Sequence, residues 1–88
     1  MKPKNAAEGQ LYDIVSGKGW TVVRSGYPDF FCVKDDKIIC VEVKPKSTHS
    51  LKTNQLRVMQ LLAAYGIPCY KWSPDGGFEK IQPIKKED

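Results

Sequence analysis

The sequence feature that most constrains the fold is a pair of largely apolar runs, 29–33 and 38–43, separated by the charged stretch 34–37 (KDDK). Two such runs around a short polar turn predict a β-hairpin. The second run carries apolar residues at both odd and even positions. Successive side chains of a strand point to opposite faces, so this pattern is typical of a strand covered on both sides. We therefore expect 38–43 to be a central strand of a sheet.

Two segments with helical periodicity can provide the covering layers. The first is predicted over 6–16, where Asn5 and Glu8 resemble a capping box at the start. The second is predicted to begin after an N-cap at Thr53 and to run to about residue 65. Its apolar stripe consists of Leu56, Met59, Leu62 and Ala63.

Three further strands complete the predicted topology. They are expected at 20–24, 67–72 and 78–81. The order is αβββαβ with a short last strand, and the second helix crosses over so that 67–72 pairs in parallel with 38–43. The predicted fold class is α/β (α+β), with a mixed central sheet flanked by two helices. The 88 residues are enough for one domain, 1–88, with a basic arm at 1–4 and a charged tail at 83–88.

Composition narrows the possible functions. The chain is 41% apolar and 27% charged, as in an ordinary globular protein. It has neither the apolar run of a membrane helix nor a signal peptide, so a cytoplasmic protein is expected. The widely spaced cysteines Cys32, Cys40 and Cys69 lack the close pairs of zinc sites and are expected to be reduced thiols. A formal charge of +4 weakly favours a polyanionic partner.

The predicted hairpin brings two acids together. If its loop is centred between Asp35 and Asp36, counting outward places Asp29 opposite Glu42 on one face. Lys44, two residues after Glu42, projects from the same face. Opposed side chains of this kind are close enough for both carboxylates to hold one cation.

Binding of a divalent cation would explain why two acids lie next to each other. Oxygen ligands from Asp29, Glu42 and the carbonyl of Val43 suit Mg²⁺ or Mn²⁺, and there is no His/Cys set to favour zinc. The cation would activate a water and neutralise phosphodiester charge, while Lys44 orients or activates that water and stabilises the transition state. The alternative is that Asp29 merely starts a strand, with Glu42 and Lys44 forming a surface salt bridge on an edge.

The motifs resemble a known family. Gly26-Tyr27-Pro28-Asp29-Phe30, then Val41-Glu42-Val43-Lys44, with Glu8 upstream and Gln55 opening the next helix, look like the VRR-NUC domain of the PD-(D/E)XK nuclease superfamily. The resemblance covers nearly the whole chain. Glu-X-Lys alone is unspecific, whereas the ordered set of motifs is specific.

This resemblance implies a restriction-endonuclease-like core and a metal-dependent endonuclease. Asp29, Glu42 and the Val43 carbonyl would bind the metal, with Lys44 assisting, Glu8 approaching the metal from the first helix and Gln55 beside it on the second. Small members of phages and bacteria resemble structure-specific enzymes that act as homodimers on branched DNA such as four-way (Holliday) junctions. The implied role is DNA repair, replication or recombination in a bacterial cytoplasm or a phage-infected cell, with no membrane and no small-molecule cofactor.

Several assignments have a plainer alternative. Glu8 can be a helix-capping residue only, and Gln55 a polar residue of a first helical turn. Tyr27 adjoins the Pro-Asp step and is a candidate nucleic-acid contact. Four basic residues are candidate phosphate contacts or a solvated basic face, namely Lys46, His49, Lys52 and Arg57. The alternatives for the whole chain are a non-catalytic nucleic-acid-binding module on the same fold and, on the small size alone, a structural subunit of a larger complex.

Overall fold

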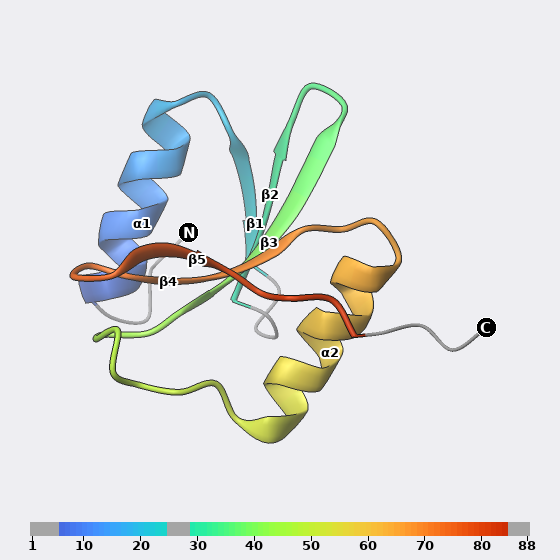
Figure 1. Cartoon of the computed structure of the whole chain (residues 1–88). Coiled ribbons are helices and arrows are strands. Elements are labelled where there is room, and N and C mark those ends of the chain that lie inside the picture. Colours follow the sequence, from blue (N-terminus) through green and yellow to red (C-terminus); the bar gives the residue numbers. More distant parts are fainter. Residues whose placement is uncertain (1–5, 25–28, 85–88) are drawn as a thin grey trace.

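The computed structural model describes residues 6–24 and 29–84 of the 88-residue chain. The described part contains two helices and five strands in the predicted order (Figure 1). The elements are α1 (Ala6–Gly17), β1 (Thr21–Arg24), β2 (Phe30–Lys34), β3 (Lys37–Val43), α2 (Thr53–Ala64), β4 (Cys69–Ser73) and β5 (Gly77–Lys80). The mixed α+β class and the αβββαβ order are confirmed.

The strands form one mixed sheet in the order β1-β2-β3-β4-β5, with β3 in the centre. Neighbouring pairs are antiparallel except β3 and β4, which are parallel because α2 carries the chain back across the sheet. Both the central position of β3 and its parallel pairing with β4 agree with the sequence prediction. Cys40 to Val43 of β3 are all buried, while Ile38 near its start is 39% exposed, so the expected coverage holds for the second half of the strand.

The two helices pack on opposite faces of the sheet (Figure 1). Leu11 of α1 lies in a core with Phe30 and Val41, which form a cross-strand pair. On the other face Met59 of α2 packs with Cys40. Because residues 40 and 41 alternate across the pleat, the single strand β3 supplies side chains to both cores. No helix in the described part of the chain is long and apolar enough to cross a membrane.

Two elements, α2 and β4, begin at other residues than the sequence predicted. Thr53 is the first residue of α2 and Lys52 is its N-cap, because the side chain of Gln55 accepts a hydrogen bond from the Lys52 amide at 3.0 Å and stabilises that end of the helix. β4 begins at Cys69 because the Ile67 amide bonds to the Leu62 carbonyl at 2.9 Å and proline 68 has no N–H to give to the sheet.

The expectation of three reduced cysteines is wrong for two of them. Cys40 and Cys69 form a disulfide between β3 and β4. The parallel register aligns these two residues directly, with Cα atoms 4.7 Å apart, although 29 residues separate them in sequence. Cys32 is a free buried thiol, and burial raises its pKa to about 11.

Candidate functional site

The hairpin register of β2 and β3 agrees with the sequence prediction. Lys34 pairs with Lys37 and, at the other end, Phe30 pairs with Val41. The next two residues outward are Asp29 and Glu42.

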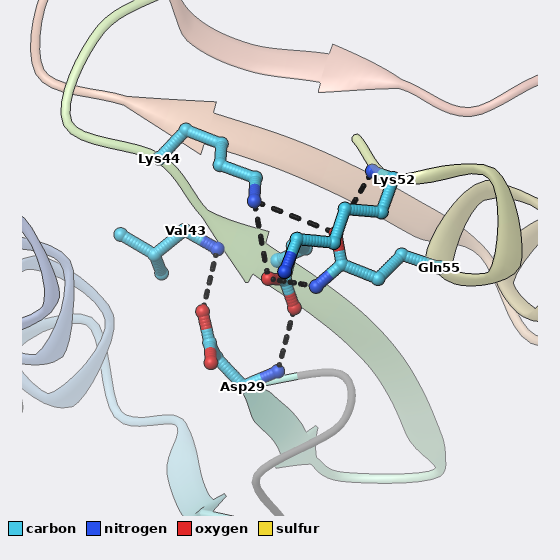
Figure 2. A network of polar contacts seen from close by, with 6 residues as sticks. Asp29, Val43, Lys44, Lys52 and Gln55 are labelled. Atoms are coloured by element: carbon cyan, nitrogen blue, oxygen red, sulfur yellow. Dashed lines mark hydrogen bonds and ion pairs between the residues drawn. The ribbon is translucent and has the colours of Figure 1, made fainter. Parts of the chain in front are cut away.

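The carboxylates of Asp29 and Glu42 each accept a hydrogen bond from a main-chain amide of the other strand's end (Figure 2). The Asp29 amide donates to Glu42 Oε1 at 3.1 Å, and the Val43 amide donates to Asp29 Oδ2 at 3.0 Å. Both acids are buried, with 7% and 5% of their surface exposed. Where the hairpin ladder ends, each carboxylate therefore takes the place of a backbone carbonyl as the acceptor of an amide N–H. These charge-assisted hydrogen bonds fix the positions of both side chains.

Lys44 and Gln55 complete a polar network around Glu42 (Figure 2). Lys44 Nζ lies 3.8 Å from Glu42 Oε2 and 3.4 Å from Gln55 Oε1. The Gln55 amide nitrogen donates to Glu42 Oε2 at 2.9 Å. Glu42 is buried on a central strand, which rules out the alternative of a surface salt bridge on a sheet edge.

Glu8 enters the same region from α1. Its side chain is 2% exposed, and its Oε1 lies 3.9 Å from Nε of Arg24. Sequence reasoning missed Arg24, which is the last residue of β1. The two-residue period of a strand places Arg24 on the same face as Val22, and the structure shows both as half-buried while Thr21 and Val23 are exposed. Asn5, the other half of the expected capping box, lies outside the described residues.

A pocket of about 470 Å³ joins these groups. It is lined by Glu8, Asp29, Glu42, Val43, Lys44, Pro45, His49 and Ser50. Three acids and one lysine therefore share one concave surface. Glu8 comes from α1, Asp29 directly precedes β2, Glu42 lies in β3 and Lys44 directly follows β3. Val43 of β3 and three residues of the loop between β3 and α2 complete the lining.

The other predicted contact residues are more scattered. His49 lines the pocket, while Lys46 is exposed on the same loop. Lys52 lines a neighbouring pocket together with Gln55, and Arg57 is exposed on α2. Tyr27 lies outside the described residues.

The donor set fits a hard divalent cation. Within 6–24 and 29–84, no three His, Cys, Asp or Glu side chains gather closely enough to hold a metal, so Glu8 lines the pocket without joining the two acids in such a group. Mg²⁺ needs only one or two carboxylates because waters and substrate phosphates supply the remaining ligands. Asp29 and Glu42 meet that need, and a carboxylate has about four lone-pair positions, so the bonds described above leave room for a cation.

Comparisons with known proteins do not assign a family. No protein-family model matches the chain, and no curated protein matches its sequence. The VRR-NUC resemblance therefore rests on the motifs themselves.

Proposed function

We propose that this chain is a Mg²⁺- or Mn²⁺-dependent nuclease that hydrolyses DNA phosphodiester bonds, a member of the VRR-NUC group of PD-(D/E)XK nucleases. The observation that carries the proposal is the pair Asp29 and Glu42, each fixed by a main-chain amide, with Lys44 beside it in one pocket. Burying a carboxylate costs several kcal/mol per ion unless partners compensate. Buried ionisable groups that gather in a cleft are typical of functional sites.

The roles of the residues follow from their positions. Asp29, Glu42 and the Val43 carbonyl would hold the cation, which when bound supplies a Lewis acid and a water of lowered pKa. Lys44 has a side chain 16% exposed and directs its ammonium toward Glu42, where it can orient a water and stabilise charge on a phosphoryl oxygen. Gln55 contacts both Glu42 and Lys44 and so holds the acid and the lysine in position relative to each other.

The substrate assignment rests on charge and on the family resemblance. A formal charge of +4 and a sequence pI near 9.0 favour a polyanion. The resemblance adds branched DNA such as four-way (Holliday) junctions, action as a homodimer, and a role in repair, replication or recombination. The corresponding location is a bacterial cytoplasm or a phage-infected cell. Cys40 and Cys69 have no exposed surface and are shielded from the reductants of such a compartment.

A cleavage panel tests this function. Linear, flapped, nicked and four-way DNA are incubated with the protein and Mg²⁺, Mn²⁺ or EDTA, and products are resolved on denaturing gels. We expect metal-dependent cleavage, strongest on branched DNA, and a dimeric mass by light scattering. Failure to cut any of these DNAs with either metal would refute the enzymatic assignment.

The second candidate function is a nucleic-acid-binding module without catalysis. It is favoured by the pairing of Glu8 with Arg24 and of Glu42 with Lys44, since both acids then have positive partners in the protein itself. Tight binding of junction DNA without cleavage in the same panel would select this function.

A further inference from the structure

The loop between β3 and α2 is attached to the turn between β4 and β5. Ser47 makes the attachment: its amide donates to Asp75 Oδ1 at 2.8 Å, and its hydroxyl donates to Asp75 Oδ2. Both oxygens of one carboxylate therefore bind one residue of the loop, 28 positions away in sequence. This bidentate arrangement fixes orientation as well as distance.

A second contact comes from the body of the sheet. Lys71 of β4 donates from Nζ to the Ser47 carbonyl at 2.7 Å and lies 3.9 Å from Glu79, its partner across β5. The Lys71 side chain is only 12% exposed. The amide, hydroxyl and carbonyl of Ser47 are thus all bonded to the β4–β5 hairpin.

The fit between loop and turn is also steric. A Cβ added at Gly76 would lie 2.7 Å from Cβ of Ser47 and 2.7 Å from Oγ of Ser73. Real Cβ atoms do not come this close to other atoms, so a side chain here must shift the loop, the turn or both out of their present contact. The Gly76 amide also donates to the buried Ser73 hydroxyl at 3.1 Å, which holds the turn in place.

The attached loop forms part of the candidate active site. Pro45, His49 and Ser50 line the pocket, and the His49 amide closes a turn onto the Lys46 carbonyl at 3.0 Å. Ser47 lies inside that turn, so its attachment fixes the segment that carries these lining residues. An unattached loop would have to be ordered each time a ligand binds, and that entropy would be lost from affinity.

We propose that Ser47 and Asp75 are positioning residues that hold loop 45–50 as a preformed contact for the nucleic-acid backbone beside the scissile phosphate. This proposal rests on the proposed nuclease function. It assigns the β4–β5 turn, which does not line the pocket, a role in substrate affinity. The bonds described above for the two acids and Lys44 do not involve Ser47 or Asp75, so we expect metal binding and the chemical step to be unaffected when the attachment is lost.

Three variants weaken the attachment in different ways. Ser47→Ala removes the hydroxyl, Asp75→Asn removes the charge, and Gly76→Ala shifts the loop, the turn or both sterically. Matched controls are Asp13→Asn on the exposed face of α1 and Gly17→Ala, where an added Cβ meets nothing within 4 Å. Cleavage of the best DNA of the panel is measured against DNA concentration at saturating Mg²⁺. Unfolding temperatures show that each variant is folded.

We expect the KM for DNA to rise about tenfold in the attachment variants, the change that follows loss of one charge-assisted hydrogen bond, with kcat within about twofold of wild type. The Mn²⁺ affinity should not change, and the controls should behave as wild type. The double variant Ser47→Ala with Asp75→Asn should resemble either single variant, because the two residues act on one contact. An unchanged KM, or a fall in kcat at constant KM, would overturn the proposal.

A binding measurement separates this inference from the nuclease assignment. The dissociation constant of fluorescently labelled four-way DNA is measured without divalent metal. If the wild type binds but does not cut, and the attachment variants bind about tenfold more weakly, the loop retains its role and the nuclease assignment fails. If the wild type cuts while all variants bind equally well, the loop proposal fails and the nuclease assignment stands. If the wild type neither binds nor cuts DNA, both fail.

Discussion

The amide of Asp29 donates to the carboxylate of Glu42 at 3.1 Å, so one acid of the candidate metal pair holds the other through its own main chain. The Asp29 carboxylate in turn accepts the amide of the residue that follows Glu42, at 3.0 Å. These two bonds tie the end of the β2–β3 hairpin together. The carboxylates therefore stabilise the hairpin end in addition to their proposed role in metal binding. An informative substitution must keep the hydrogen bonds to the main-chain amides and remove the ability to bind the metal.

Asp29→Asn is such a substitution. The amide oxygen can still accept from the Val43 N–H, so we expect the unfolding temperature to stay close to wild type. Loss of the negative charge should weaken Mn²⁺ binding and reduce cleavage about 100-fold or more. Asp13→Asn is the control for a change of the same type on the surface. Wild-type cleavage by Asp29→Asn would remove Asp29 from the metal site.

Lys44→Ala separates the metal site from catalysis. The two carboxylates and their main-chain bonds remain, so Mn²⁺ binding measured by calorimetry should persist. Cleavage should fall about 100-fold or more, because the cationic group that we propose to stabilise phosphoryl charge is lost. Lys37→Ala, at the exposed start of β3, provides the control for removal of a lysine. Parallel loss of metal binding and cleavage in Lys44→Ala would instead indicate a collapse of the pocket.

Arg24→Met tests the ion pair with Glu8. Glu8 is 2% exposed, so removal of the guanidinium withdraws a compensating charge from a buried acid. We expect the free energy of unfolding in urea to fall by about 1–3 kcal/mol, with part of the loss restored in the double variant Arg24→Met with Glu8→Gln. Equal stability of Arg24→Met and wild type would show that the 3.9 Å contact contributes nothing.

The cysteines have distinct expected reactivities. Unreduced protein unfolded in guanidinium should expose one thiol to Ellman's reagent, because Cys40 and Cys69 are paired. The native protein should expose none at pH 8, since Cys32 is buried and its pKa is raised to about 11. A folded-state pKa above the ordinary thiol value of 9.0 also means that the free energy of unfolding falls as pH rises from about 9 to about 11. Three reactive thiols would disprove the disulfide.

The attachment of the loop at Asp75 has a predictable pH dependence. Hydrogen bonds from the hydroxyl and amide of Ser47 lower the pKa of Asp75 below its ordinary 3.8, and Lys71 and Glu79 are the charged groups on the neighbouring strands. A lowered folded-state pKa gives stability that is present above 3.8 and is lost as pH falls through the folded value. The stability difference between wild type and Asp75→Asn should therefore be constant near neutral pH and shrink in acid. A difference that does not change with pH would contradict this.

The sequence indicated the parts of the fold that depend on local patterns. The pairing of Asp29 with Glu42 follows from a short symmetric turn and the two-residue period of strands, both readable from the chain. The pairing of Cys40 with Cys69 depends on where β4 starts, which is decided by the last turn of α2 and by a proline. The contact of Ser47 with Asp75 joins two irregular segments that have no periodicity at all. Contacts of this kind form only once the sheet is assembled, so no local pattern indicates them.

The central strand also sets an order of assembly. Its antiparallel neighbour β2 is reached through a turn of a few residues, whereas its parallel neighbour β4 comes only after the whole of α2. Contacts that are close in sequence cost less loop entropy and form faster than distant ones. We therefore expect Asp29 and Glu42 to meet early in folding, and the contacts made by Gln55 and by the β4–β5 turn to form late. An intermediate stalled between these stages would bring the two acids together without the groups that complete the site.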